Sequence, residues 1–168
     1  IGLGQIGRKV AKRLHGFDMK ILGYDPFADN IPAYIKITDL KNLVQESDFL
    51  LLHSRLSAQT HHLIDSEMLG LMKSTAYLIN TARSGLIDED ALYAALKDRK
   101  IAGAALDVFN VEPLPAGCAL IDLPNVTITP HLAGSTTDAF FQSPHLLAEE
   151  MLPFLSGNIA SDCIVNNK

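Results

Sequence analysis

Three glycines stand close together near the start of the chain, and a single acid follows them. The segment 1–7 reads IGLGQIG, and Asp25 comes eighteen residues after its last glycine. Glycines at this spacing permit a tight turn, a close approach of backbone N–H groups to a pyrophosphate, and close packing of the next helix on its strand. An acid at the tip of the second strand can accept hydrogen bonds from ribose hydroxyls. The glycines and Asp25 together predict a dinucleotide site.

Further polar residues accompany four short apolar runs, at 49–52, 76–80, 101–108 and 126–129, which have the length and composition of buried strands. At or just past the ends of these runs lie the side chains that could do chemistry, namely His53, Ser54, Arg55, Asn80, Thr81, Ala82, Arg83, Asp107 and His131. The carboxyl ends of parallel strands share one edge of a sheet. We therefore expect these groups to converge on one rim.

Amphipathic helices alternate with the apolar runs. Apolar residues recur at helical spacing in 6–14, 40–44, 68–72 and 91–96, and another strand is expected at 19–24. The later helices have polar residues placed to cap them, and these are Thr38 or Asp39, Asp65 or Ser66, and Asp88. The alternation predicts an α/β fold with a doubly wound, mostly parallel Rossmann sheet. Only Ile1 precedes the glycine loop, so we expect the sheet to be truncated at its first strand.

The composition narrows the possible functions. The 168 residues are 48% hydrophobic and 20% charged, with a net charge of −5, as in a globular protein. The sequence has no cluster of basic residues for nucleic acid or a membrane surface, no apolar run of membrane-spanning length, and no Cys/His spacing typical of a metal site. Cys118 and Cys163 are too few for a disulfide framework, which predicts a cytoplasmic protein.

The last part of the chain has a different pattern. Ser135 with Asp138 resembles a cap for a long helix that continues to Leu155. Pro144 and Pro153 interrupt the pattern, and we expect a kink or a break there. We assign residues 1–134 to a dinucleotide-binding domain and residues 135–168 to a connecting helix and a segment that returns to a substrate domain.

Four segments together resemble the cofactor-binding domain of the D-isomer-specific 2-hydroxyacid dehydrogenases. They are GLGQIG at 2–7, INTARSGLIDEDALYAAL at 79–96, IAGAALDVFNVEPLP at 101–115 and NVTITPHLAGST at 125–136. The resemblance covers residues 1 to about 157 and is far more specific than the glycine loop alone. In that family the substrate domain comes mainly from residues ahead of the glycine loop, so the resemblance implies that this domain is largely missing here.

The resemblance implies three catalytic residues, Arg83, Glu112 and His131. Hydride transfer at an alcohol carbon needs a proton acceptor, a group that orients it, and a cation for the substrate carboxylate. His131 would be the acid and base, Glu112 its carboxylate partner, and Arg83 the carboxylate-binding fork. Taken singly, each residue also has a structural interpretation: His131 as a loop histidine, Glu112 as a solvated acid, and Arg83 as a surface partner of Asp88 or Glu89.

The resemblance also implies NAD as the cofactor. Its contacts would come from the glycine loop, from Asp25 and from the rim, at Gly2, Gly4, Gln5, Ile6, Gly7, Asp25, Ser54, Arg55, Thr60, Thr81, Ala82, Asp107 and Gly134. Two positions depart from the family's pattern. Arg55 stands where proline is common and adds a cation near the ribose, and Ser84 stands where glycine is common.

We therefore expect an NAD-dependent enzyme that interconverts a 2-hydroxy acid and a 2-oxo acid. The family resemblance implies a homodimer formed through the cofactor domain. Glyoxylate or hydroxypyruvate, phosphoglycerate and lactate-like acids all remain possible substrates, and we expect these 168 residues alone to be inactive. Two alternatives stay open: a nucleotide-sensing, corepressor-type binding protein on the same fold, and a non-catalytic truncated remnant. A formate dehydrogenase is disfavoured because that group carries an amide where this chain has Glu112.

Overall fold

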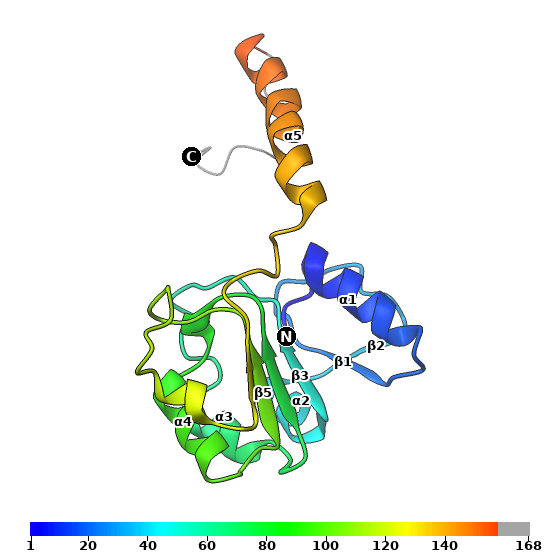
Figure 1. Cartoon of the computed structure of the whole chain (residues 1–168). Coiled ribbons are helices and arrows are strands. Elements are labelled where there is room, and N and C mark those ends of the chain that lie inside the picture. The colour runs from blue at the N-terminus through cyan, green and yellow to red at the C-terminus, as the bar shows by residue number, and fades with distance from the viewer. Residues whose placement is uncertain (158–168) are drawn as a thin grey trace. The chain divides into compact units, whose positions relative to one another are not determined.

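The computed structural model describes residues 1–157 of the chain, so Cys163 lies outside the described residues. The chain divides into two compact units, of which the first is Ile1–Pro130 and the second begins at His131. The strands named below belong to the first unit, and the long helix α5 (Thr137–Leu155) belongs to the second (Figure 1).

The strands of the first unit form two parallel sheets. In the smaller sheet β1 (Ile21–Gly23) pairs with β2 (Ile35–Ile37). The larger sheet has the order β3, β4, β5, β6, with the bounds Phe49–Leu52, Tyr77–Asn80, Gly103–Leu106 and Val126–Ile128. Each of these pairs is parallel. The predicted α/β class with a parallel sheet is confirmed.

Ile1 and Gly2 join the two sheets. The backbone N–H of His53, just past β3, donates to the Ile1 carbonyl at 2.8 Å, and the N–H of Gly2 donates to the carbonyl of Tyr24, just past β1, at 2.9 Å. These two residues stand between β1 and β3, where the first strand of a doubly wound sheet lies. Ile1 and Gly2 therefore bridge the two sheets at the position of that strand.

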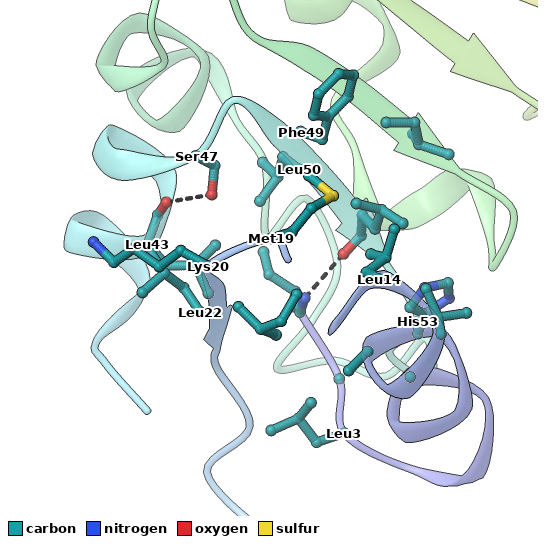
Figure 2. Close-up of a pocket in the computed structure, with 18 of the residues that line it drawn as sticks. Leu3, Leu14, Met19, Lys20, Leu22, Leu43, Ser47, Phe49, Leu50 and His53 are labelled. Atoms are coloured by element: carbon teal, nitrogen blue, oxygen red, sulfur yellow. Dashed lines mark hydrogen bonds between the residues drawn. The ribbon is translucent and has the colours of Figure 1, made fainter. Parts of the chain in front are cut away.

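A cavity of about 350 Å³ is lined by residues of β1, β3 and the helix that follows the glycine loop (Figure 2). Apolar side chains line most of it, among them Leu22 of β1 and Phe49 of β3. Arg83 and Asp107 are not among its lining residues. The cavity therefore lies between β1 and β3 and reaches Gly2, Gly7 and His53, but it does not reach Arg83 or Asp107.

Helices α1 (Gln5–His15), α2 (Leu40–Glu46), α3 (Ser66–Leu71) and α4 (Glu89–Lys97) connect the strands. Helices α2, α3 and α4 pack side by side, and α1 lies apart from them (Figure 1). Of the predicted caps, Asp39, Asp65 and Asp88 each accept a backbone N–H of the first turn, at 2.9, 2.9 and 3.1 Å. These carboxylates satisfy donors that the helix leaves unpaired, so the three helix starts agree with prediction.

The main core lies between the larger sheet and the row of helices. Leu50 and Leu78 of the strands pack with Val44, Leu69 and Leu92 of the helices, and all five are at most 2% exposed. Burial of a side chain of this size contributes about 1.5–3 kcal/mol. This core fixes β3, β4 and β5 and hence the loops at their carboxyl ends. Two short 3₁₀ helices, η1 (Ser84–Leu86) and η2 (Ala119–Asp122), lie in such connections.

Strand β2 was not predicted, and four predicted strands are shorter than expected. Only Ile35–Ile37 pairs with β1, and three residues are too few to show a clear alternation of apolar and polar side chains. The run 101–108 contributes only Gly103–Leu106 to the sheet, and the run 126–129 only Val126–Ile128. The runs 19–24 and 76–80 are likewise shortened, to Ile21–Gly23 and Tyr77–Asn80. Just outside the observed bounds, backbone N–H groups still donate to the neighbouring strand, from Ala102 to Ala76, from Asp107 to Asn80 and from Thr129 to Leu106.

Helix α5 corrects two predictions. The cap is Thr136, whose side chain accepts the N–H of Ala139 at 3.0 Å, and not Ser135. The helix also runs from Thr137 to Leu155 through both prolines without a break. Each proline removes one backbone donor, and the helix is exposed along its length, so water can reach the carbonyl that is left unpaired.

Candidate active site

The glycine loop has one face pressed against the protein and one face open. A Cβ on Gly2, whose φ is +86°, would lie 2.6 Å from the Ser54 nitrogen, and a Cβ on Gly7 would lie 2.0 Å from the Gly2 carbonyl oxygen. A Cβ on Gly4 would meet nothing within 4 Å. Gly4 is the N-cap of α1, so the backbone at Gln5 and Ile6 begins a helix at this open face. Such a helix start fits a pyrophosphate.

Asp25 is tied to the glycine loop by hydrogen bonds. Its Oδ2 accepts the N–H of Leu3 at 2.7 Å, and its Oδ1 accepts the N–H of Phe27 at 2.9 Å. Each carboxylate oxygen can accept a further hydrogen bond. The acid is thereby held next to the loop with acceptor capacity left for a ribose diol.

The loop after β3 is closed on itself by Thr60. Its Oγ1 donates to the Arg55 carbonyl at 2.7 Å and accepts the N–H of Ser57 at 2.8 Å. Ser54 lies directly against Gly2, and Arg55 is exposed. The structure thus brings Ser54 to the glycine loop, whereas Thr60 shapes the segment that carries Arg55.

Asn80 forms the turn that presents Arg83, a role that the sequence analysis did not assign. Its side chain is 1% exposed; Nδ2 donates to the Arg83 carbonyl at 2.9 Å, and Oδ1 accepts the N–H of Ala82 at 3.0 Å. Both ends of the amide therefore hold the backbone of the turn. The exposed Thr81 and Arg83 project from it. An asparagine at the end of an apolar strand was the available signal, because Asn commonly bonds the backbone two residues on.

Arg83 is not engaged by the two acids that could have made it a surface ion pair. Within the described residues it makes no ion pair with Asp88 or Glu89, and its Nη1 donates to the Ala82 carbonyl at 2.6 Å. Asp88 caps α4, and Glu89 accepts the N–H of Asn110 at 3.2 Å. Arg83 therefore does not form the surface ion pair with Asp88 or Glu89 that was the alternative to a catalytic role. The 3₁₀ helix η1 begins at Ser84, next to Arg83. A Cβ on Gly85 would lie 3.0 Å from Leu56, so glycine at this position allows η1 to pack closely against Leu56.

Two acids lie on the segment after β5. Asp107 is 2% exposed, and its Oδ1 accepts the hydroxyl of Thr129, which follows β6. Glu112 is exposed, and its Oε1 accepts the N–H of Phe109 at 2.9 Å. Asp107 stands beside Asn80 in the sheet, because its N–H donates to the Asn80 carbonyl at 3.0 Å. The carboxyl ends of β4 and β5 thus bring Asp107 close to the turn of Arg83, as predicted for a rim.

His131 and Gly134 belong to the second unit. His131 has a φ of 55°, a left-handed conformation that is uncommon for a residue with a side chain and is often found at functional sites. The Gly134 carbonyl accepts the N–H of Thr136 at 3.1 Å, in the turn that leads into α5.

His53 differs from the other residues of the rim. It is half-buried, and its Nε2 has no hydrogen-bond partner in the part of the chain that the structure describes. Burial lowers the pKa of His53 to about 4. This histidine is neutral near pH 7 and is a poor proton donor there. Sequence position alone could not separate it from His131.

Neither a metal centre nor a membrane helix is found among the described residues. In residues 1–157 no three His, Cys, Asp or Glu side chains are placed to hold a metal ion. Over the same range, none of the helices combines the length and the apolar character that a membrane crossing requires.

Comparison with known proteins adds an independent observation. Residues 1–133 match the family described as D-isomer specific 2-hydroxyacid dehydrogenase, NAD binding domain. The chain is 44% identical over 163 residues to a glyoxylate reductase of Thermofilum pendens, a match that covers 95% of this chain and 48% of that protein.

Two solved structures have the same fold. The NAD-complexed D-isomer specific 2-hydroxyacid dehydrogenase of Lactobacillus delbrueckii ssp. bulgaricus gives a TM-score of 0.87 at 31% identity, over 97% of this chain and 54% of that one. An acyclic imino acid reductase in complex with NADPH and D-arginine gives a TM-score of 0.88 at 35% identity, over 95% and 50%. The chain spans about half the length of each of these relatives.

Proposed function

Because this chain belongs to the NAD-binding domain family of the D-isomer specific 2-hydroxyacid dehydrogenases, we propose that it is the cofactor-binding half of an NAD-dependent oxidoreductase. The whole enzyme would interconvert a 2-hydroxy acid and a 2-oxo acid. The observation that carries this proposal is Asn80, whose side chain holds the turn of Arg83 and whose carbonyl accepts the N–H of the buried Asp107. A cation and an acid carried by the ends of neighbouring strands suit a small polar substrate and an amide-bearing cofactor.

The fit of NAD rests on the glycine loop. The open space at Gly4 and the start of α1 suit a pyrophosphate, and Asp25 retains acceptors for the adenosine ribose. Ser54, Arg55 and Thr60 would border the adenosine side. Thr81, Ala82, Asp107 and Gly134 would border the nicotinamide, where Asp107 could accept from the carboxamide. When bound, NAD supplies the hydride acceptor.

Arg83 would bind the substrate carboxylate. Its guanidinium is exposed and unpaired with acids in the first unit, and its planar fork can bind a carboxylate in two places. The cation would also polarise the neighbouring carbonyl of a 2-oxo acid.

His131 and Glu112 would move the proton. A histidine can hold the alcohol proton during oxidation and return it during reduction. The carboxylate of Glu112, already oriented by the N–H of Phe109, would favour the imidazolium of His131 and select its tautomer. We place the two residues together in the working enzyme as part of this proposal.

The substrate would be a small 2-oxo acid or 2-hydroxy acid. The similarity to a glyoxylate reductase favours glyoxylate or hydroxypyruvate for the first assays, with phosphoglycerate and lactate-like acids as the other classes. We further propose a cytoplasmic homodimer, formed through the cofactor-binding domain.

The test is turnover of the full-length protein. NADH and a panel of 2-oxo acids should give loss of NADH absorbance with at least one acid. Arg83→Lys should lower kcat/KM for that acid by about a hundredfold and leave NADH affinity nearly unchanged. NADH binding without turnover of any acid would instead support the corepressor-type alternative, and absence of NADH binding would support the non-catalytic one.

A further inference from the structure

Arg8, in the first turns of α1, bonds to three backbone carbonyls at once. Its Nε donates to the Leu3 carbonyl at 2.6 Å, its Nη1 to the Asn30 carbonyl at 3.1 Å, and its Nη2 to the Asp29 carbonyl at 2.5 Å. The carboxylate of Asp29 adds an ion pair at 3.6 Å, but this carboxylate is 87% exposed. The backbone bonds, and not this exposed ion pair, are therefore the main contacts of Arg8.

These bonds connect two segments that are distant in the sequence. Leu3 lies inside the glycine loop, and Asp29 and Asn30 lie in the loop that follows Asp25. Asn30 has a φ of 45°, so its backbone is in a conformation that needs support from its surroundings. Arg8 supplies such support through the Asn30 carbonyl.

The geometry suits arginine and not lysine. Three N–H donors on a rigid plane reach three acceptors in different directions. A lysine has a single nitrogen at the end of a flexible chain and cannot span the Leu3 carbonyl and the 29–30 loop together. Positive charge alone would not reproduce the contact.

We infer that Arg8 is a positioning residue for cofactor recognition, which holds the Asp25 loop in register with the glycine loop. Asp25 is bonded to Leu3 through the Leu3 N–H, and Arg8 is bonded to the same residue through the Leu3 carbonyl. The two contacts hold the peptide groups on either side of Leu3. Arg8 thereby fixes the distance between the pyrophosphate-binding backbone and the ribose-binding acid. This role rests on the proposed NAD site.

The experiment compares three variants of the full-length protein by titration with NADH and with NADPH. Arg8→Gln removes both the charge and the fork, and Arg8→Lys keeps the charge. Arg13→Gln makes the same charge change on the same helix, where, among residues 1–157, the Arg13 side chain donates only to the Lys9 carbonyl of its own turn. We expect both Arg8 variants to weaken NADH binding about tenfold, and Arg13→Gln to bind as the wild type does. At saturating NADH, kcat and the KM for the 2-oxo acid should stay near normal.

The ratio of NADH to NADPH affinity separates positioning from simple charge attraction. If Arg8 aligns Asp25, both Arg8 variants should lower this ratio, because the acid that rejects a 2′-phosphate is less well placed. If Arg8 acts only as a positive charge that attracts the cofactor's phosphate groups, Arg8→Lys should bind NADH as the wild type does. Arg8→Gln should then raise the ratio of NADH to NADPH affinity, because NADPH carries the additional phosphate. Either of those results would overturn the inference. A wild-type protein that does not bind NADH would instead overturn the proposed function.

Discussion

The backbone N–H of Leu3 donates a hydrogen bond of 2.7 Å to Oδ2 of Asp25 and so joins the glycine loop to the acid that follows β1. The acid is oriented before any ligand is present, because its other oxygen accepts the N–H of Phe27. A preorganised acceptor loses little freedom when a ribose diol binds. The same fixed negative charge disfavours a phosphate at the ribose 2′ position.

Asp25 should therefore determine whether the protein binds NADH or NADPH more tightly. We expect the full-length protein to bind NADH more tightly than NADPH, because Asp25 repels a 2′-phosphate. Asp25→Asn should weaken NADH binding about tenfold, since an amide keeps only one of the two oxygen acceptors. It should also reduce the preference for NADH over NADPH, since an amide has no negative charge. Fluorescence titration with both cofactors measures these affinities. Equal or tighter NADPH binding by the wild type would contradict the prediction, and the exposed Arg55 would then be the first residue to examine.

The turn of Arg83 should depend on the side chain of Asn80. In Asn80→Asp, a protonated carboxyl can still donate to the Arg83 carbonyl, whereas an ionised one repels it. We expect the activity of this variant, relative to the wild type, to fall as the pH rises. The measurement is the ratio of kcat/KM values across pH, with NADH affinity and thermal melting as controls for folding. A ratio that does not change with pH would show that the Asn80 amide does not govern Arg83.

Glu112 should set the pH dependence of reduction. A neighbouring carboxylate stabilises the imidazolium and raises the pKa of a histidine. Because Glu112→Gln would remove this stabilisation of a protonated His131, we expect the upper pH limit for reduction to move down. His131→Ala should remove most turnover at every pH. The pH profile of kcat/KM for the 2-oxo acid tests both variants, and an unshifted limit in Glu112→Gln would mean that the two residues are not coupled.

His53 should make the fold sensitive to acid. Burial lowers its pKa to about 4, below the ordinary value of about 6.5, so the folded state favours the neutral ring. The stability from this preference is complete above pH about 6.5 and is lost as the pH falls toward 4. We expect a loss of about 1–2 kcal/mol in the free energy of unfolding, reduced for solvent screening of a half-buried group.

Urea unfolding of wild type and His53→Gln at several pH values tests this expectation. The variant should lose less stability than the wild type as the pH falls. His145→Gln, which replaces an exposed histidine of α5, serves as the control and should follow the wild type. Parallel curves for wild type and His53→Gln would refute the assignment.

The sequence predicted those parts of the fold that depend on local chemistry. Asp39, Asp65 and Asp88 cap their helices because a carboxylate at a helix start bonds backbone donors only a few residues away. Strand β3 was predicted as observed, because a continuous apolar run is typical of a buried parallel strand. The placement of Asp25 next to the glycine loop also follows from the motif and its spacing.

The parts that were missed depend on partners distant in the chain. Strand β2 exists because Ile35–Ile37 pairs with β1, and nothing within three residues predicts that pairing. Arg8 is one of several charged residues on α1, and only the fold brings the 29–30 carbonyls to it. The shift of the α5 cap from Ser135 to Thr136 is a choice between adjacent hydroxyls. Such choices depend on the backbone dihedral angles, which residue types do not fix.

The three glycines of the loop differ in what surrounds them. Gly2 and Gly7 are confined by the protein's own backbone, whereas the space beside Gly4 is open. A side chain at either of the first two positions would disturb the empty protein as much as the loaded one. A side chain at Gly4 would clash with nothing until a ligand came to occupy that space. Of the three, only Gly4 could become alanine without a steric clash in the empty protein and still weaken the binding of its ligand.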